Sequence, residues 1–211
     1  MDGRPSAPVR VKICGVTRLV DALAAVALGA DAVGFNFWPR SKRYLPPAEA
    51  CAIVRRLPPF VVAVGVFVDP TRDEVLRAVE ASGVGVAQLH GDESPELCLS
   101  LPLPVLKAIR VADGRSLAQL ASYDVSGFLL DAPSAGYGGS GLTFDWSLVA
   151  EVARELPIVL AGGLTPDNVA DAVRSVRPWA VDVASGVESA PGVKDHEKLR
   201  RFVEQAKEAA R

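Results

Sequence analysis

Near the start of the chain, Lys12 and Cys14 are two positions apart in a short apolar run. Successive side chains of a β-strand alternate, so these two groups are expected on the same side. An ammonium group beside a thiol lowers the pKa of the thiol, and the resulting thiolate is a base or a nucleophile. The alternative is a small buried apolar side chain, which is the interpretation favoured for Cys51 and Cys98 because both lie in helical patterns.

Asp131 directly follows apolar residues at the end of another predicted strand. A carboxyl group held there can keep its proton and act as an acid near neutral pH, although a cap or an ion pair is the alternative. The segment 135–146 that follows is rich in glycine and is typical of a mobile cover. It matches G-x-G-x-x-G formally, but a dinucleotide site needs a tight turn in the first βα unit, so we expect no such cofactor.

Two glycine-containing turns follow the last two predicted strands. Gly162 and Gly163 lie after the first of these strands, and Ser185 and Gly186 lie after the second. Glycine lets the backbone approach a ligand closely, and these two loops form the commonest phosphate site of eight-stranded α/β barrels. The pair of turns therefore predicts a phosphate site.

Cations cluster at 40–43, after the second predicted strand. A solvated charged loop is the usual interpretation, but the planar group of Arg43 would suit a carboxylate at the same rim. His90 ends the fourth predicted strand and either lines the pocket or has a structural hydrogen bond. Clusters with metal-ligand spacing are lacking in the sequence, so we expect no metal site.

The elements that would position these residues alternate regularly. Predicted strands cover 9–13, 32–37, 61–68, 86–89, 105–110, 127–131, 158–161 and 181–184. Helical spacing covers 19–28, 47–57, 72–82, 94–101, 116–122, 146–156, 167–176 and 195–209. Strands that are continuously apolar are buried on both faces, as in a parallel sheet covered by helices. Eight βα units predict a compact single-domain (βα)8 TIM barrel, with an open doubly wound sheet as the alternative.

Composition narrows the class of protein further. The 211 residues are 49% hydrophobic with a formal net charge of −2, which disfavours a nucleic-acid or membrane-surface partner. Three cysteines and no apolar leader predict a cytoplasmic protein. We expect a flexible tail at 1–9 and one catalytic domain over 10–211, whose oligomeric state, monomer or homodimer, is left open.

These motifs together resemble one enzyme family. The resemblance is to the phosphoribosylanthranilate isomerases of tryptophan biosynthesis, and the segments that carry it are 11–15, 41–44, 88–91, 130–131, 138–141, 144–146, 161–164, 182–188 and 194–195. The resemblance implies an Amadori rearrangement of N-(5-phosphoribosyl)anthranilate to 1-(2-carboxyphenylamino)-1-deoxyribulose 5-phosphate, without a cofactor. It also implies that Cys14 is the general base and Asp131 the general acid. Arg43 would hold the anthranilate carboxylate, and backbone groups of Gly163 and Gly186 would hold the phosphate.

Three other interpretations remain open. A histidine-pathway aminoaldose isomerase performs the same rearrangement, but its family is similar to two fused half-barrels with an aspartate base, and here Cys14 takes that position. An indole-forming lyase is a further barrel enzyme of this kind. A catalytically silent phosphate-binding barrel belongs to a different class, and the presence of both Cys14 and Asp131 argues against it.

Overall fold

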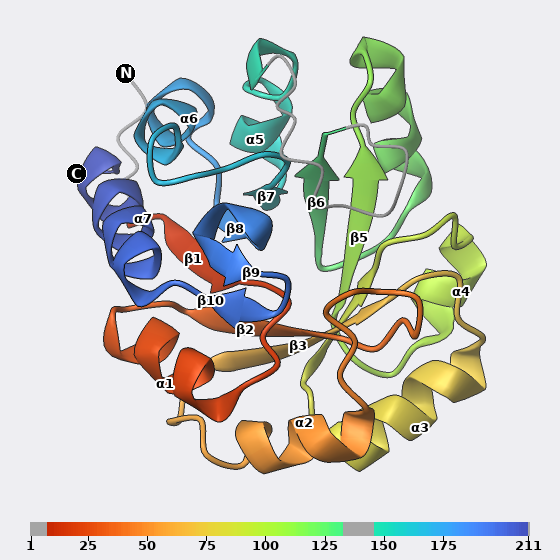
Figure 1. The fold of residues 1–211 in the computed structure, drawn as a ribbon. Coiled ribbons are helices and arrows are strands. Elements are labelled where there is room, and N and C mark those ends of the chain that lie inside the picture. Colours follow the sequence, from red (N-terminus) through yellow and green to blue (C-terminus); the bar gives the residue numbers. More distant parts are fainter. Residues whose placement is uncertain (1–7, 133–145, 211) are drawn as a thin grey trace.

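Eight parallel strands form a closed barrel in which each strand pairs with the next and β8 returns to β1 (Figure 1). The computed structural model describes residues 8–132 and 146–210. The strands are β1 (Arg10–Ile13), β2 (Ala32–Asn36), β3 (Val62–Phe67), β4 (Val86–Leu89), β5 (Val105–Arg110), β6 (Gly127–Asp131), β7 (Ile158–Leu160) and β8 (Ala180–Val183). At the closure, Arg10 pairs with Ala180 and Ile13 with Val183. The predicted TIM barrel is confirmed.

Helices surround the barrel on its outside (Figure 1). The α-helices are α1 (Leu19–Ala27), α2 (Pro47–Val54), α3 (Arg72–Ser82), α4 (Pro95–Ser100), α5 (Val152–Glu155), α6 (Val169–Val176) and α7 (His196–Ala209). Short 3-10 helices are η1 (Gly114–Ser122), η2 (Trp146–Leu148) and η3 (Ser185–Val187). The start of α3 shows local control, because the side chain of Thr71 accepts from the backbone N–H of Glu74 and the Glu74 carboxylate accepts from that of Thr71.

The strands are mainly apolar because both of their faces are covered. Every residue of β6, β7 and β8 is buried. One face packs against the helices in the main core. The other face contributes a smaller interior cluster: Ala108, Leu129, Val159, Ala161 and Ala180. These apolar side chains fill the narrow interior below the mouth of the barrel. Alternation then puts Asp131 and Asp182, two positions beyond Leu129 and Ala180, on the same side.

Three local elements differ from the sequence-based expectations. The predicted helix at 116–122 is a 3-10 helix that begins at Gly114, where the Asp113 carboxylate accepts from two backbone N–H groups. The predicted helix at 146–156 is divided into η2 and α5, because bonds of the i→i−3 and i→i−4 types alternate there. An antiparallel hairpin of β9 (Glu188–Ala190) and β10 (Val193–Lys194) was not expected.

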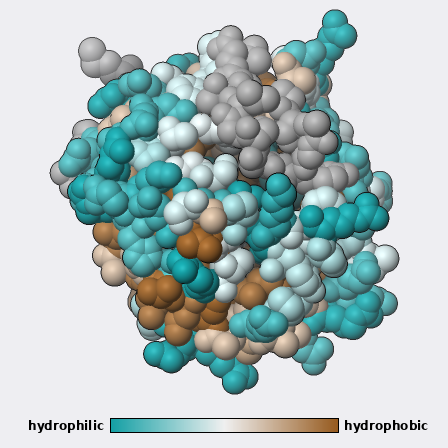
Figure 2. All heavy atoms as spheres, viewed as in Figure 1, coloured by the Kyte–Doolittle hydropathy of each residue, from teal (hydrophilic) through white to brown (hydrophobic). Residues whose placement is uncertain are grey.

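Parts of two predictions lie outside the described residues. These are residues 1–7 of the predicted tail and residues 133–145, which include nearly all of the glycine-rich cover. In the parts of the chain that are described, no helix has the length and apolar character needed to cross a membrane. Figure 2 shows this face of the molecule as mainly hydrophilic, with its apolar residues gathered where α1 lies in Figure 1.

Candidate active site

A cavity of about 70 Å³ lies at the carboxyl ends of the barrel strands. Of the eight residues predicted as site residues, seven line it: Cys14, Arg43, His90, Asp131, Gly162, Ser185 and Gly186. A second and more open hollow of about 500 Å³ shares Arg43 and Ser185 with the first. The barrel therefore brings together residues that are up to 172 positions apart in the chain, with room beside them for a larger ligand.

Cys14 lies one residue beyond β1, and its backbone N–H donates to the carbonyl of Val183 at 2.8 Å. Its thiol shares a small space with the Lys12 ammonium, because a Cβ atom on Gly34 would lie 3.1 Å from the Cys14 Sγ and 3.2 Å from the Lys12 Nζ. Lys12 is itself paired with Asp182, at 2.8 Å between Nζ and Oδ1. Gly34 thus makes room for both side chains.

The electrostatics at Cys14 correct one expectation. Burial raises the pKa of the Cys14 thiol above its usual range, and the nearby Lys12 and Lys194 ammonium groups lower it by less. We expected Lys12 to bring this thiol toward a neutral pKa, but desolvation of the thiolate is the larger effect. The pKa of Lys12 is raised even though its own burial lowers it, because Asp182 and Cys14 favour the charged form.

Asp131 ends β6 and is 6% exposed. Its Oδ1 accepts from the backbone N–H of Ala132 at 2.9 Å. Its Oδ2 lies 3.2 Å from the Nε2 of His90, whose Nδ1 lies 2.9 Å from the Nε2 of Gln88. The carboxyl group is therefore held in a fixed orientation at the mouth, next to a histidine whose ring is held from its other side.

Arg43 forms two hydrogen bonds with an acidic residue for which the sequence analysis predicted no role. Its Nε and Nη2 atoms donate to the two carboxylate oxygens of Glu188, at 2.8 and 2.7 Å. The hydrogen bond from Arg43 helps to lower the pKa of Glu188 despite the opposing effect of burial. Gly15 has φ +69°, and a Cβ atom there would overlap the Cδ of Arg43, so this glycine gives the arginine its path to the mouth.

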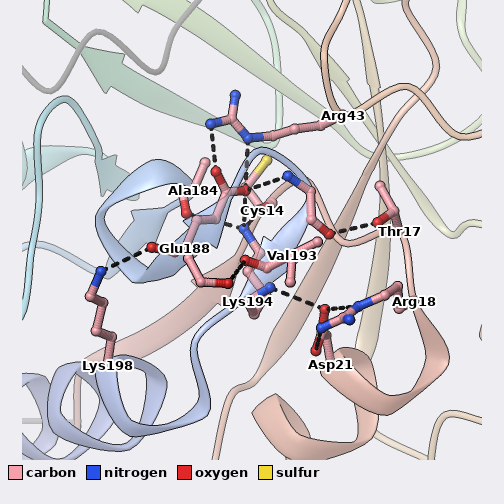
Figure 3. A network of polar contacts seen from close by, with 12 residues as sticks. Cys14, Thr17, Arg18, Asp21, Arg43, Ala184, Glu188, Val193, Lys194 and Lys198 are labelled. Carbon is pink, nitrogen blue, oxygen red and sulfur yellow. Dashed lines mark hydrogen bonds and ion pairs between the residues drawn. The ribbon is translucent and has the colours of Figure 1, made fainter.

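A buried lysine, Lys194, links the Glu188 partner of Arg43 to the ends of β1 and β8 (Figure 3). The Lys194 Nζ donates to the carbonyl of Cys14 at 2.6 Å, to that of Ala184 at 3.1 Å and to the Glu188 carboxylate at 2.9 Å. Burial lowers the pKa of Lys194 despite the opposing effect of Glu188. The hairpin that carries Glu188 and Lys194 is therefore fastened to the ends of β1 and β8.

The two glycine turns lie against each other. A Cβ atom on Gly186 would overlap the carbonyl oxygen of Leu164, and one on Gly162 would overlap the backbone nitrogen of Ala132. Gly162 and Gly163 both have positive φ, at +83° and +65°. Gly163 is the one predicted residue that does not line the 70 Å³ cavity, and its carbonyl accepts from the Asn168 side chain at 3.0 Å.

Gln88, Asp182 and Glu188 also line these hollows, although we predicted no role for them. A signal for Asp182 was present, since an acid inside the apolar run of β8 needs a buried partner. Glu188 could not be found in this way, because the hairpin that positions it was not predicted. Within 8–132 and 146–210, no three His, Cys, Asp or Glu side chains are grouped as metal ligands.

Known proteins resemble this chain over nearly its whole length. The sequence model of the N-(5'-phosphoribosyl)anthranilate isomerase family matches residues 11–205. The N-(5'-phosphoribosyl)anthranilate isomerase of Myxococcus xanthus is 52% identical over 204 residues, which cover 94% of this chain and 96% of the relative.

Two solved structures agree with the sequence match. The phosphoribosyl anthranilate isomerase of Thermotoga maritima superimposes with a TM-score of 0.91 at 47% identity, covering 95% of this chain and 99% of its own. A second isomerase structure, in complex with reduced 1-(o-carboxyphenylamino)-1-deoxyribulose 5-phosphate, gives a TM-score of 0.87 at 44% identity over 95% and 99% of the two chains. This chain belongs to the N-(5'-phosphoribosyl)anthranilate isomerase family.

Proposed function

We propose that this chain converts N-(5-phosphoribosyl)anthranilate to 1-(2-carboxyphenylamino)-1-deoxyribulose 5-phosphate, as a step of tryptophan biosynthesis, with Asp131 as general acid and Cys14 as general base. Membership of the isomerase family supports the reaction. The observation that carries the two roles is that a thiol and a carboxyl group, from the ends of β1 and β6, line one small cavity. Both are groups that move protons in enzymes.

In the first step, the protonated Asp131 carboxyl group donates its proton to the ring oxygen of the ribose. The bond between C1 and this oxygen breaks, and the nitrogen lone pair forms an iminium ion. Asp131 is left as a carboxylate, and the backbone N–H of Ala132 at 2.9 Å stabilises that charge. The fixed orientation of the carboxyl group supports this role, because proton transfer needs a donor within hydrogen-bond reach.

In the second step, the Cys14 thiolate removes the proton from C2. The electron pair of that bond forms the enolamine, which then becomes the ketone of the product. Burial disfavours the thiolate, so the Lys12 and Lys194 ammonium groups act against that cost. One group thus has to be protonated and the other ionised in the same cavity.

The binding roles follow the same geometry. The bonds described for Arg43 use Nε and Nη2 toward Glu188, which leaves Nη1 to face a substrate carboxylate. Backbone groups of Gly162, Gly163, Ser185 and Gly186 would hold the phosphate, and the close packing of the two turns supports a compact anion site. His90 lies beside Asp131 and would contact the sugar. A monomer or homodimer and a cytoplasmic location remain predictions.

The test of this function is turnover of freshly prepared phosphoribosylanthranilate, followed through the loss of substrate fluorescence. We expect a catalytic conversion that needs no added cofactor. No turnover by the folded protein would overturn the proposal in favour of a silent phosphate-binding barrel. Turnover of the histidine-pathway aminoaldose instead would favour the other isomerase interpretation.

A further inference from the structure

Gln88 is a buried amide that none of the roles above uses. It lies in β4, is 1% exposed and lines the same cavity as Cys14 and Asp131. Its Nε2 is 2.9 Å from the Nδ1 of His90, while its Oε1 has no hydrogen-bond partner among the described residues. A buried amide oxygen without a partner costs free energy, so this side chain is a candidate for more than packing.

The histidine beside it is held firmly. The backbone N–H of His90 donates to the carbonyl of Phe67 at 2.8 Å, and the carbonyl of Gly91 accepts from the buried Lys107 ammonium at 2.8 Å. The imidazole then lies between the Gln88 amide and the Asp131 carboxyl group, with one ring nitrogen facing each. Any change in the amide is therefore passed to Asp131 through a ring that does not have to move.

The proton positions on the three hydrogen-bonded side chains Gln88, His90 and Asp131 depend on each other. With the amide NH2 group facing Nδ1, that nitrogen must accept, so the neutral ring carries its proton on Nε2 and donates it to the Asp131 carboxylate. With the amide turned by half a rotation, its oxygen accepts from Nδ1–H. A neutral ring then has an Nε2 lone pair that accepts a hydrogen bond from the protonated Asp131 carboxyl group.

The second arrangement contains one more proton, which is shared between the Asp131 Oδ2 and the His90 Nε2. It is the arrangement an acid catalyst needs, because this proton is available to the ring oxygen of the substrate. When the proton has gone to the substrate, Asp131 is a carboxylate and His90 still carries its proton on Nδ1. The first arrangement forms once Nδ1 loses that proton to solvent water, Nε2 takes one from solvent water and the amide turns back.

We propose that Gln88 is a positioning residue that selects the tautomer of His90 through the orientation of its amide, and so determines whether Asp131 holds the proton it donates. This inference rests on the proposed role of Asp131 as general acid. Gln88 does not touch the reacting atoms in this account. It acts through His90, and the amide suits this task because its NH2 group donates hydrogen bonds and its oxygen accepts them.

Other charged or titratable groups lie on the elements around the pair. They are Lys12 and Cys14 at β1, Arg43 after β2, Arg110 in β5 and Asp182 in β8. Arg110 lies opposite Asp131 in the register of β5 and β6. The Arg110 Nη2 is 3.7 Å from the Asp92 Oδ1. The test has to leave all of these residues unchanged and alter the amide alone.

The direct readout is the tautomer of His90, measured by ¹⁵N NMR of the imidazole nitrogens in the free protein. The chain has only two histidines, and His196, whose Nε2 is 2.9 Å from the Asp21 Oδ1, serves as an internal reference. In the wild type we expect the neutral ring to carry its proton on Nε2, as the amide NH2 group facing Nδ1 requires. Gln88→Glu supplies an acceptor only, so the neutral ring should carry its proton on Nδ1 instead.

Steady-state kinetics of a second variant are the second part of the test. Gln88→Met removes both the donor and the acceptor of the amide at similar side-chain volume. We expect kcat to fall about tenfold while KM stays within about twofold of the wild type. Loss of a partner that orients a histidine has an effect of this size in metal sites. The melting temperature and an unchanged His196 signal serve as folding controls. The proposal is overturned if Gln88→Glu leaves the tautomer of His90 unchanged, or if Gln88→Met keeps the wild-type kcat. Because the NMR arm needs no substrate, a failure of the isomerase function would appear separately, as a lack of turnover by the wild type.

Discussion

Cys14 is in an environment that opposes the charge its proposed role requires. Burial raises the pKa of the thiol, while Lys12 and Lys194 lower it and Asp182 raises it through its charge. The lysine and the aspartate are bound to each other at 2.8 Å, so their charges act on the thiol as a pair. The fraction of thiolate is therefore set by side chains two residues away in sequence and at the opposite end of the chain.

Lys12→Met tests this balance. Without the ammonium group the pKa of Cys14 should rise further, and a rise of one unit lowers the thiolate fraction at neutral pH about tenfold. We expect kcat/KM at neutral pH to fall by about that factor, and its rise with pH to move toward higher pH. The measurement is the pH profile of kcat/KM.

Lys12→Met combined with Asp182→Leu is the control for stability, because it leaves no buried carboxylate without its partner. The double variant should fold and show a smaller upward shift than the single variant, because Asp182, which itself raises the pKa of Cys14, is also removed. A pH profile identical to that of the wild type in both variants would remove Lys12 from the account.

At the scale of elements, the β9–β10 hairpin positions Arg43, the residue proposed to bind the substrate carboxylate. Glu188 begins this hairpin and binds Arg43 through both oxygens, while Lys194 ends it and binds the carbonyl of Cys14 (Figure 3). The Thr17 hydroxyl donates to the carbonyl of Gly192 at 2.6 Å, which fastens the tip of the hairpin as well. Arg43 is thus oriented before any substrate arrives.

Glu188→Gln should weaken that orientation while keeping the size of the side chain. The neutral amide retains at most one good acceptor for Arg43, so we expect KM to rise about five- to tenfold, equivalent to roughly 1–1.4 kcal/mol, with a smaller change in kcat. Steady-state kinetics measure both constants. Glu197→Gln, which breaks an exposed pair with Arg200, is the matched control and should behave as the wild type. Equal KM values in the two variants would show that Glu188 does not position Arg43.

Gly186→Ala tests the packing of the two glycine turns. The new methyl group would overlap the carbonyl oxygen of Leu164, so the turns must separate. Overpacking of this kind costs about 1–3 kcal/mol, which lowers Tm by at least about 2 °C in a chain of this size. We also expect a higher KM, because the proposed phosphate site is opened.

Gly85→Ala is the control for this variant, since nothing lies within 4 Å of a Cβ atom at that position. Thermal melts and kinetics of the two variants compare them directly. If Gly186→Ala melts and binds as Gly85→Ala does, the contact between the turns has no energetic importance.

Sequence reasoning predicted the strands well and the irregular elements poorly, for a physical reason. A parallel strand buried on both faces is a continuous apolar run, so each of the eight was found with ends that differ by at most one residue from the structure. The hairpin at 188–194 has no such pattern, because the contacts that form it come from Thr17, Cys14 and Arg43. Cys14 and Asp131 could be singled out as candidates because each is a reactive group at a strand end, whereas Gln88 becomes a candidate only through its contact with His90.

At the scale of the whole molecule, Asp21 connects the first part of the chain to the last part, where the barrel closes. It lies on α1 with its side chain fully buried, and it accepts from Arg18 on its own helix boundary, from the backbone N–H of Lys194 on β10 and from His196 on α7. Burial raises its pKa, but these hydrogen bonds outweigh that effect and leave the pKa of Asp21 below its usual value of 3.8. One carboxylate therefore stabilises the closure between the first and last βα units.

Asp21→Asn should destabilise the protein in a pH-dependent way. Because the pKa is lowered on folding, the ionised group contributes stability above about pH 3.8, and this contribution is lost as the pH falls through the lower folded value. The difference in Tm between wild type and variant should be largest near neutral pH and shrink below pH 4. Asp171→Asn, at an exposed pair with Arg174, should show no such trend. A difference in Tm that is independent of pH would contradict the linkage.

The central claim is that Asp131 and Cys14 act as acid and base in one cavity. The most direct measurement is kcat for Cys14→Ser and Asp131→Asn at saturating phosphoribosylanthranilate, with Cys51→Ser as the control that leaves the cavity intact. The account predicts that each of the two variants loses at least about 10²-fold in kcat with a modest change in KM, while the control keeps wild-type activity. Near wild-type turnover in either Cys14→Ser or Asp131→Asn would contradict it.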